Sequence, residues 1–477
     1  MMMTSPSLVP LLHQTPAEVL QESLVALVSA DPAQAEILAA AHPFADTIGV
    51  MLAGGKDPRT RELMRTAHFS RSALPGLACF PGGDLWGSAA DVAQVLGFAA
   101  HLLDHDDDET EIAMAHLSAP CLAAALAIAA RQGASLTTAD LVAAYITGCK
   151  AMLVVGSAVN PALYKAGWHA TSVLGVFGAA AAAARLLRLD NSATAHAFGL
   201  AASAASGPRG AFGGEGKPFQ VGMAAASGVR VALLANERWK SGQGALAGDR
   251  GLLTRMADLR MPQEAGSFPP SGFVTKLYPT CTATHSAVSE LISLRSAAGQ
   301  EKGLPASVRC GVDPFVPQIL ISGLPNGPEA ARFSLEYCLA YAALHGALTP
   351  GAFVEAAFRD GMPADERIRS LMERIEVAVD RTLPKGPSGI STGATVTLVW
   401  ADGTTIEGTR ETAPGSVASP LSSEMLCEKF TQGLATICPP RDAKALWAKV
   451  TNLIDFPTVA ALLEALPKAF TLPGQTT

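Results

Sequence analysis

The chain has 477 residues, of which 49% are hydrophobic and 16% are charged, and its net charge at neutral pH is −7. A chain of this length exceeds what one hydrophobic core usually organises, so its length predicts two domains. The negative charge and the lack of a basic run argue against nucleic acid as a partner, because that binding depends on clustered Lys and Arg. The low fraction of charged residues indicates that much of the chain's surface is buried, some of it between subunits. An anionic substrate stays open, since a positive pocket can lie within an acidic protein.

Neither a secretory leader nor a membrane span is expected. Residues Met1 to Gln14 lack the basic, apolar and cleavage segments of a signal peptide. The stretch from Ala166 to Ala184 reaches the length of a span, but it contains Trp168, His169 and several glycines, which favours a buried helix. The eight cysteines include no C-x-x-C pair and no zinc-ligand spacing. They indicate buried thiols in a reducing compartment, and we therefore expect a cytoplasmic protein.

The first half of the chain predicts one helix after another. Between Thr15 and about Trp239, Ala- and Leu-rich runs alternate with Gly, Pro or polar breaks. Alanine favours helix and lets helices approach closely, so we expect an all-α domain with a core of small side chains. The expected helices are Pro32 to Ala41, Ala89 to Leu103, Ala119 to Arg131, Thr138 to Ala158, Val173 to Leu187, Ser192 to Ala205 and Ala224 to Glu237.

Beyond about Pro269 the pattern changes to mixed α and β. Two runs rich in β-branched residues, Gly393 to Trp400 and Thr404 to Thr409, flank an Asp-Gly pair. This arrangement is a strong signal for a β-hairpin. Shorter runs typical of strands are Val308 to Val316 and Ile375 to Val379. We expect a smaller α+β domain here.

Helical patterns return near the end of the chain, at Glu424 to Gly433, Asp442 to Leu453 and Pro457 to Leu466, and Ser422 is a candidate cap for the first. The fold class is therefore predicted to be mainly α. We expect a large all-helical domain built from both chain ends, residues 1–269 and 422–477. A smaller α+β domain, residues 270–421, is inserted between them.

Five acidic residues occur within the six positions from Asp104 to Glu109. His116 follows, and then Ser118, a candidate N-cap of the next helix. For the acids, a solvated loop, the wall of an active site and a metal site all stay open, although the spacing of a calcium loop is absent.

Two segments place a basic side chain next to a predicted helix. His169 precedes a long helix of small residues, with Thr171 or Ser172 as candidate cap, and the start of a helix suits a carboxylate ligand. Lys217 lies in a predicted glycine-rich loop, where the backbone can approach a ligand closely. The segment matches neither a Walker A motif nor a dinucleotide fingerprint, and a flexible surface loop is the alternative.

Two later segments contain further candidates. Lys276 and Tyr278 precede His285, which opens a predicted helix, and Cys281 is either a nucleophile or a small core thiol. Tyr337 lies at the start of a helix in the second domain, where it either reaches a cleft or packs in a core.

In this order, five segments of the chain resemble the motifs of the MmgE/PrpD family, which includes 2-methylcitrate dehydratase, cis-aconitate decarboxylase and iminodisuccinate epimerase. The segments are Leu103 to Asp108 with His116 to Ser118, Gly167 to Thr171, Gly216 to Gly228, Lys276 to His285 and Phe333 to Tyr337. The resemblance extends over about residues 15–470.

The resemblance implies a helical domain made from both chain ends, a smaller α+β lid domain and a homodimer. It also implies that no metal or organic cofactor is used and that the active site lies between the domains. The residues that fall on the family's site positions are Asp104, His116, His169, Lys217, Lys276 and Tyr337.

Three positions depart from the family pattern. Asp108 and Gly216 stand where the family usually has Thr, and Gln220 replaces a frequent His. These departures leave the exact substrate open.

The resemblance and the residue types together predict a cofactor-independent lyase that acts by acid–base chemistry on a small di- or tricarboxylate. His116 and His169 would move protons, and Lys217 and Lys276 would bind carboxylates and stabilise developing charge. Asp104 would orient a histidine or act as a base.

Tyr337 would close the pocket from the lid. Dehydration of a 2-methylcitrate-like substrate and decarboxylation of a cis-aconitate-like substrate both fit these roles. An epimerase of an iminodisuccinate-like compound, a carboxylate-binding protein without activity and a helical scaffold are the alternatives.

Overall fold

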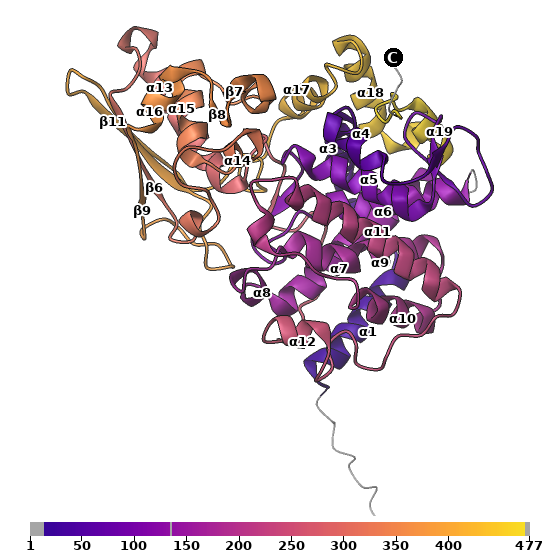
Figure 1. Ribbon diagram of the computed structural model, residues 1–477. Helices are drawn as coiled ribbons and strands as arrows, with labels where there is room; N and C mark the ends of the chain where they lie inside the picture. Colours follow the sequence, from indigo (N-terminus) through magenta and orange to yellow (C-terminus); the bar gives the residue numbers. More distant parts are fainter. Residues whose placement is uncertain (1–13, 134–135, 473–477) are drawn as a thin grey trace, which may run out of the picture.

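The structure is a computed structural model that describes residues 14–133 and 136–472. Its fold is mainly α with small β-sheets, as the sequence predicts. Figure 1 shows a helical body and, to one side of it, a region that contains the largest sheet. The expectation for Met1 to Gln14 falls almost wholly outside the described residues.

The helical body contains every helix predicted in the first half of the chain. Its longer helices are α1 (Pro16–Ser29), α3 (Ala41–Gly55), α5 (Ala89–Leu102), α6 (Ser118–Gln132), α7 (Thr138–Val159), α9 (Ala170–Leu186), α10 (Asn191–Ala201) and α11 (Gly216–Asn236). Shorter ones are α2 (Gln34–Ala39), α4 (Pro58–Met64), α8 (Ala162–Lys165) and α12 (Leu252–Met256).

The sequence analysis missed α1 and α3. The sequence of α3 contains Pro43, which usually marks a break, but here it lies in the first turn. There its missing N–H would have had no partner within the helix.

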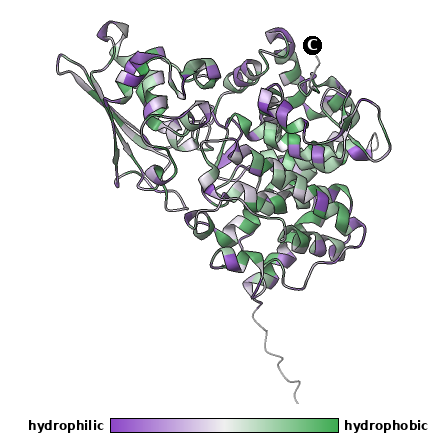
Figure 2. Ribbon diagram, in the orientation of Figure 1, coloured by the Kyte–Doolittle hydropathy of each residue, from purple (hydrophilic) through white to green (hydrophobic). Residues whose placement is uncertain are grey.

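Small residues bring the central helices close together, as predicted. A Cβ added at Gly228 of α11 would lie 2.3 Å from the Cβ of Ala179 in α9. One added at Gly148 of α7 would lie 2.8 Å from the carbonyl oxygen of Gly178. Figure 2 shows the apolar character of these central helices. The close approach fixes the helix ends, which matters because those ends carry the site described below.

The helical body is not purely helical, which corrects the prediction. Three two-residue strands, β1 (Phe69–Ser70), β2 (Ala78–Cys79) and β3 (Trp86–Gly87), form a small sheet in the order β1-β3-β2. Elsewhere β4 (Asp108–Glu109) pairs with β5 (Phe273–Val274) in antiparallel register. This pairing ties the acidic segment to the chain just before Lys276.

The second region has its own hydrophobic core around a four-stranded sheet of order β11-β10-β6-β9. The strands are β6 (Ser307–Val312), β9 (Ile375–Val379), β10 (Ala394–Val399) and β11 (Thr405–Arg410). The predicted hairpin is confirmed, because β10 and β11 are antiparallel and Val399 pairs with Thr405.

Helices and short strands complete the second region. The helices are α13 (His285–Ala298), α14 (Pro328–Ala331), α15 (Leu335–His345) and α16 (Glu366–Met372), and a second, two-stranded sheet consists of β7 (Phe358–Arg359) and β8 (Met362–Pro363). α13 packs on β10 and β11, and α15 packs on α13 and α16.

The last helices occur where the sequence predicts helices, and they pack on the helical body. They are α17 (Ser423–Gly433), α18 (Pro440–Thr451) and α19 (Val459–Ala465), and Ser422 caps the first by accepting a hydrogen bond from the N–H of Met425. α17 and α18 pack on α3, and α19 packs on α6 (Figure 1). Buried residues from Leu20 to Phe273 and from Leu426 to Phe470 therefore share one core.

Three helical segments are long and apolar enough to cross a membrane: Gln34–Gly55, Thr138–Val159 and Gly216–Asn236. Between 61% and 89% of each apolar window is buried inside the fold. The stretch considered above overlaps α9, which is shorter than these helices. All eight cysteines are free thiols, but only Cys121, Cys149, Cys310 and Cys338 are fully buried, so the prediction of buried thiols is correct for half of them.

Candidate active site

A cavity is lined by side chains from the helical body and from the second region. Five of the six predicted site residues line it, namely Asp104, His116, His169, Lys217 and Lys276. The structure therefore brings together residues that are up to 172 positions apart in the sequence.

Asp104 lies just beyond the end of α5 and joins the two lysines. Its Oδ1 pairs with the Nζ of Lys217 and, at 3.1 Å, with the Nζ of Lys276. Its backbone is in the left-handed region, with φ at 49°, which non-glycine residues rarely adopt. Its Oδ2 is buried and accepts no hydrogen bond from any described residue. One carboxylate oxygen is therefore used to hold the lysines, and the other has no partner among the described residues.

Three buried cations hold the backbone of this segment. Arg332 donates to the carbonyl of Leu103 at 2.8 Å, Lys276 to that of Asp104 at 3.1 Å, and Lys429 to that of His105 at 2.8 Å. These three carbonyls are consecutive and follow the C-terminus of α5, where positive charge is favoured. Each cation comes from a different part of the chain, so the second region and the C-terminal helices both position the site.

The charges in this cluster depend on one another. Burial alone would raise the pKa of the Asp104 carboxyl, but the ammonium groups of Lys217 and Lys276 hold it well below its usual value. Burial alone would lower the pKa of Lys276, yet Asp104, Asp106 and Asp108 raise it. Lys276 therefore stays protonated at neutral pH and acts as a fixed positive charge rather than as a base.

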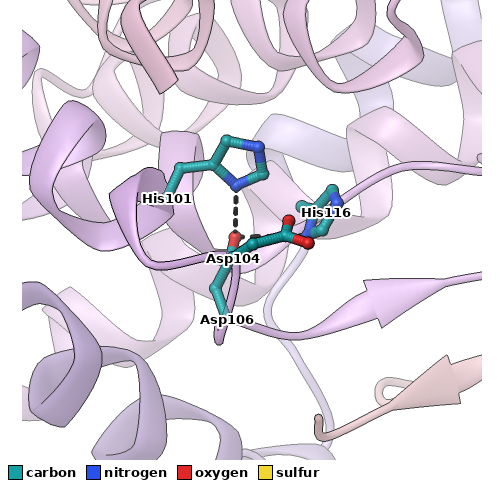
Figure 3. Close-up of side chains that lie close together, drawn as sticks. All are labelled: His101, Asp104, Asp106 and His116. Carbon is teal, nitrogen blue, oxygen red and sulfur yellow. Dashed lines mark hydrogen bonds and ion pairs between the residues drawn. The ribbon is translucent and has the colours of Figure 1, made fainter. Parts of the chain in front are cut away.

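His116 reaches the pocket from the segment before α6 and is oriented by two residues that the sequence analysis missed. Asp106 Oδ2 lies 3.3 Å from His116 Nδ1 and 2.8 Å from His101 Nδ1 (Figure 3). His116 Nε2 lies 3.5 Å from the Nζ of Lys217. Burial lowers the pKa of His101 to about 3, so this ring is neutral and serves as a hydrogen-bond donor to Asp106.

The signal for His101 and Asp106 is present in the sequence. His101 lies in the last turn of a helix whose end leads directly into the acidic segment.

His169 is the residue just before α9, and its ring is held from the neighbouring helix α11. Its Nδ1 lies 2.8 Å from the Oε1 of Gln220, which makes Nδ1 the protonated nitrogen. Its Nε2 is buried and has no hydrogen-bond partner among the described residues. Burial, followed by the charge of Lys217, holds the pKa of His169 well below its ordinary value. His169 is therefore neutral, with a free lone pair.

No side chain caps α9, contrary to the expectation for Thr171 or Ser172. Thr171 accepts a hydrogen bond from the backbone N–H of His116 instead, at 3.0 Å. Ser172 donates to the carbonyl of Ser206.

Lys217 lies in the first turn of α11 and not in a loop, which corrects the prediction. The glycines before it form the approach to the helix, and Lys217 itself is 5% exposed. Its Nζ lies 5.4 Å from the ring centre of Phe212 and 5.2 Å from that of Phe333. Two aromatic rings and Asp104 therefore hold the ammonium group in place.

The acidic segment is part of the cavity wall and not a solvated loop, because Asp104, Asp108 and Glu109 line the cavity. Asp107 accepts hydrogen bonds from the N–H groups of Leu117 and Ser118, so Asp107 caps α6 in place of the predicted Ser118. Glu109 is fully buried and accepts from the N–H groups of residues 111–114. These two acids shape the turn that carries His116.

Cys281 lines the pocket but has no base beside it. Burial, together with the charge of Asp104, raises the pKa of its thiol to about 11. His285 lies in the helix that it was predicted to open, and its Nε2 lies 3.4 Å from the carbonyl of Thr280. This geometry opposes a nucleophilic role for Cys281.

Tyr337 is not among the lining residues, which corrects the prediction. Its side chain is fully buried in the core of the second region, and its hydroxyl donates to the carbonyl of Ala352 at 2.5 Å. Its ring packs against those of Tyr341, Phe353 and Phe358. The alternative of a core aromatic is the one observed, because Tyr337 lies on the face of α15 that is buried in the core of the second region.

His101, Asp104, Asp106 and His116 have ligand-type atoms within 4.8 Å of one another, a distance that suits a metal ion. Two ammonium groups already pair with Asp104, however, and a divalent cation there would lie beside both. The donor set is therefore better suited to moving protons than to holding a cation.

The fold and this buried set of acid–base groups define an enzyme, and comparison with known proteins identifies its family. The chain matches the MmgE/PrpD N-terminal domain over residues 22–264 and the MmgE/PrpD C-terminal domain over residues 278–453. The chain therefore belongs to the MmgE/PrpD family, and it is an enzyme of the lyase class.

Its relatives include cis-aconitate decarboxylases. The chain is 25% identical to that of Homo sapiens over 388 residues, which are 78% of each protein. It is 24% identical to that of Aspergillus terreus over 393 residues, which are 76% of this chain and 78% of the relative.

Proposed function

We propose that this enzyme removes a proton or a carboxyl group next to a carboxylate of a small polycarboxylate, without a metal or an organic cofactor. The observation that carries the proposal is the pair of lysines and the pair of histidines that converge on one cavity with Asp104. The relatives named cis-aconitate decarboxylase support a reaction of this type.

The lysines supply binding and charge stabilisation. Lys276 is held protonated by its acidic neighbours, and Lys217 is fixed between two rings and Asp104. Removal of a proton and removal of a carboxyl group both leave negative charge on a carbon next to a carboxylate. Fixed positive charge stabilises this negative charge where it develops. Because the groups are already in place, little reorganisation is needed when a substrate binds.

The histidines move the proton. His169 lines the cavity and is neutral, and its Nε2 has no partner among the described residues, so in a dehydration or an epimerisation it accepts the proton that is removed from carbon. His116 presents its Nε2 beside the ammonium group of Lys217, which allows it to receive and return a proton. In a dehydration His116 protonates the departing hydroxyl group, and in a decarboxylation it protonates the carbon left by CO2.

An epimerase is the second candidate, and one observation favours it. Two histidines line the same cavity, as removal of a proton from one face of a carbon and its return to the other would require. Such an enzyme would exchange the substrate proton with solvent and form no new double bond.

The test is incubation of the protein in D2O with cis-aconitate, 2-methylcitrate and iminodisuccinate, and with the related dicarboxylates citraconate and citramalate, followed by NMR. A lyase forms or consumes a carbon–carbon double bond or releases CO2, and deuterium enters the product of a hydration or a decarboxylation. An epimerase incorporates deuterium and inverts one centre. If every compound stayed unchanged and free of deuterium, the proposal would be wrong.

We further propose that the enzyme acts as a cytoplasmic homodimer and that the second region closes over the cavity as a lid. Exposed apolar side chains on α11, Phe219 and Met223, support an interface between copies. Measurement of the mass in solution by light scattering tests the dimer, and a monomer at all concentrations would contradict it.

A further inference from the structure

The charges that line the cavity do not favour a highly charged substrate. The lining contains two basic side chains, Lys217 and Lys276, and three acidic ones, Asp104, Asp108 and Glu109. Asp104 is ionised and is bound to both lysines. The cavity therefore offers no excess of positive charge, although its proposed substrate is an anion.

Asp108 differs from Asp104 and Glu109 because no basic side chain or set of backbone N–H groups among the described residues balances its charge. Asp104 pairs with the lysines, and the carboxylate of Glu109 is used by backbone N–H groups. Asp108 has no basic partner within ion-pair distance among the described residues, and its one hydrogen bond comes from the N–H of Glu109 at 3.0 Å. Its strand pairing with Val274 fixes its backbone in the wall of the cavity.

Asp108 also lies close enough to affect the lysine that is proposed to bind the substrate. Its charge contributes to raising the pKa of Lys276. Between two unit charges about 4 Å apart the interaction is roughly 1 kcal/mol in water and about 4 kcal/mol near a protein surface. A substrate carboxylate placed near Asp108 would meet a repulsion of this order.

The rest of the lining is mixed. Hydroxyl groups come from Thr110, Thr171, Thr282, Ser391 and Thr392. A set of apolar side chains comes mostly from the second region, with Phe315, Val316, Ile319, Phe333 and Ile390, and is joined by Met114, Tyr164 and Phe212 from the helical body. A carboxylate against such a surface would lose its hydration without a partner, whereas a methyl or short alkyl group would gain by burial.

We propose that the cavity selects a dicarboxylate with an uncharged, apolar third substituent, and that Asp108 is the residue that excludes a third carboxylate. The two lysines bind the two carboxylates, and the third substituent packs against the apolar lining. The inference rests on the proposed function, and it narrows the substrate class of the same site. Exclusion by a repulsive group is a common way to achieve specificity.

The experiment compares two pairs of compounds that differ by one carboxylate. Citraconate is cis-aconitate with a methyl group in place of one carboxymethyl group, and citramalate is related to citrate in the same way. The affinity of each compound is measured by calorimetry for the wild-type protein and for Asp108→Asn. Asparagine keeps the size of the side chain and its acceptor for the Glu109 N–H, and removes the charge.

The wild type is expected to bind the dicarboxylate of each pair at least about tenfold more tightly. Asp108→Asn is expected to improve binding of the tricarboxylate at least about fivefold and to change binding of the dicarboxylate less than about threefold. Asp249→Asn, which removes an exposed charge outside the cavity lining, is the control for net charge and should change neither. Asp108→Ser serves as a second variant if the amide disturbs folding.

Two results would overturn the inference: a wild type that prefers the tricarboxylate, or an Asp108→Asn protein in which both affinities change equally. Methylsuccinate and tricarballylate form a third pair that differs in the same way and has neither a leaving group nor a double bond. Their affinities are measured without turnover, so the outcome is separate from that of the proposed function. Lack of reaction with every compound would refute the proposed lyase chemistry while the ratio of affinities still decides the role of Asp108.

Discussion

The two parts of the cavity lining differ in the origin and the support of their side chains. The polar part comes mainly from the ends of helices in the helical body, and specific partners hold its side chains Asp104, Lys217 and His169. The apolar part comes mainly from connecting segments of the second region and includes Val316, Phe333 and Ile390. The comparison indicates a division in which the helical body supplies most of the groups for the chemistry and the second region supplies most of the apolar surface against which the substrate packs.

Replacement of Lys217 by Met tests the polar part and should have the largest effect. It removes a positive charge that is proposed to stabilise the reaction and leaves Asp104 with one ammonium partner. Turnover should fall by about 10²–10⁴-fold. The matched control in the apolar part is Ile390→Val, which should alter the relative KM of different substrates and change kcat less than about threefold. Equal losses of kcat in both variants would contradict the division.

Replacement of Lys429 by Met tests whether the C-terminal helices position the chemistry from a distance. Lys429 does not line the cavity, but it donates to the carbonyl of His105 and to Asp46, each at 2.8 Å. Loss of this clamp should lower kcat about 10–100-fold with little change in KM, because small displacements of reacting groups are costly.

Lys429→Arg, which keeps the charge and the donors, should recover much of the activity. A loss of thermal stability in Lys429→Met without any loss of kcat would show that Lys429 is only structural.

His285 provides a pH-dependent test outside the proposed chemistry. Burial, followed by the charge of Lys276, lowers the pKa of His285 from 6.5 to about 3. Below pH 6.5 the unfolded chain binds a proton at this residue that the folded protein does not, so the contribution of His285 to stability is kept above pH 6.5 and lost as the pH falls.

Between pH 7 and pH 5 the wild type should therefore lose about 2 kcal/mol more of its free energy of unfolding than His285→Gln does. Urea unfolding of both proteins at the two pH values measures this difference. Parallel losses would mean that His285 is protonated in the folded protein.

Replacement of Tyr337 by Phe should have the smallest effect and separates the core of the second region from the cavity. The variant loses only the hydrogen bond to the carbonyl of Ala352, which leaves that buried acceptor without its partner. We expect a loss of about 1–2 kcal/mol in the free energy of unfolding and turnover within about threefold of the wild type. A loss of turnover comparable to that of Lys217→Met would place Tyr337 in the chemistry after all.

Much of the fold is predictable from the sequence because helix propensity and the Asp-Gly hairpin signal act locally. The central helices and the pairing of β10 with β11 are examples. The short strands β1 to β3 are not predictable, since two residues carry no periodicity and their pairing depends on distant neighbours. Similarly, Pro43 predicts a helix break from the sequence, although it lies in the first turn of α3, where a helix tolerates proline.

The site is predictable to the extent that ordered motifs mark it. Five candidates line one cavity, but the sequence could not show that His101 supports Asp106 or that Lys429 holds the backbone of His105. Those contacts join segments far apart in the chain, and only the packed structure brings them together. Tyr337 was misplaced for the same reason, because helical periodicity does not say which core a helix faces.

The most direct test of the account is a crystal structure with methylsuccinate, a dicarboxylate that has a methyl group and neither a leaving group nor a double bond. The account predicts carboxylate oxygens at about 3 Å from the Nζ atoms of Lys217 and Lys276, and the methyl group against Phe333 or Ile390. A carboxylate against the apolar lining, or a ligand bound away from both lysines, would contradict it.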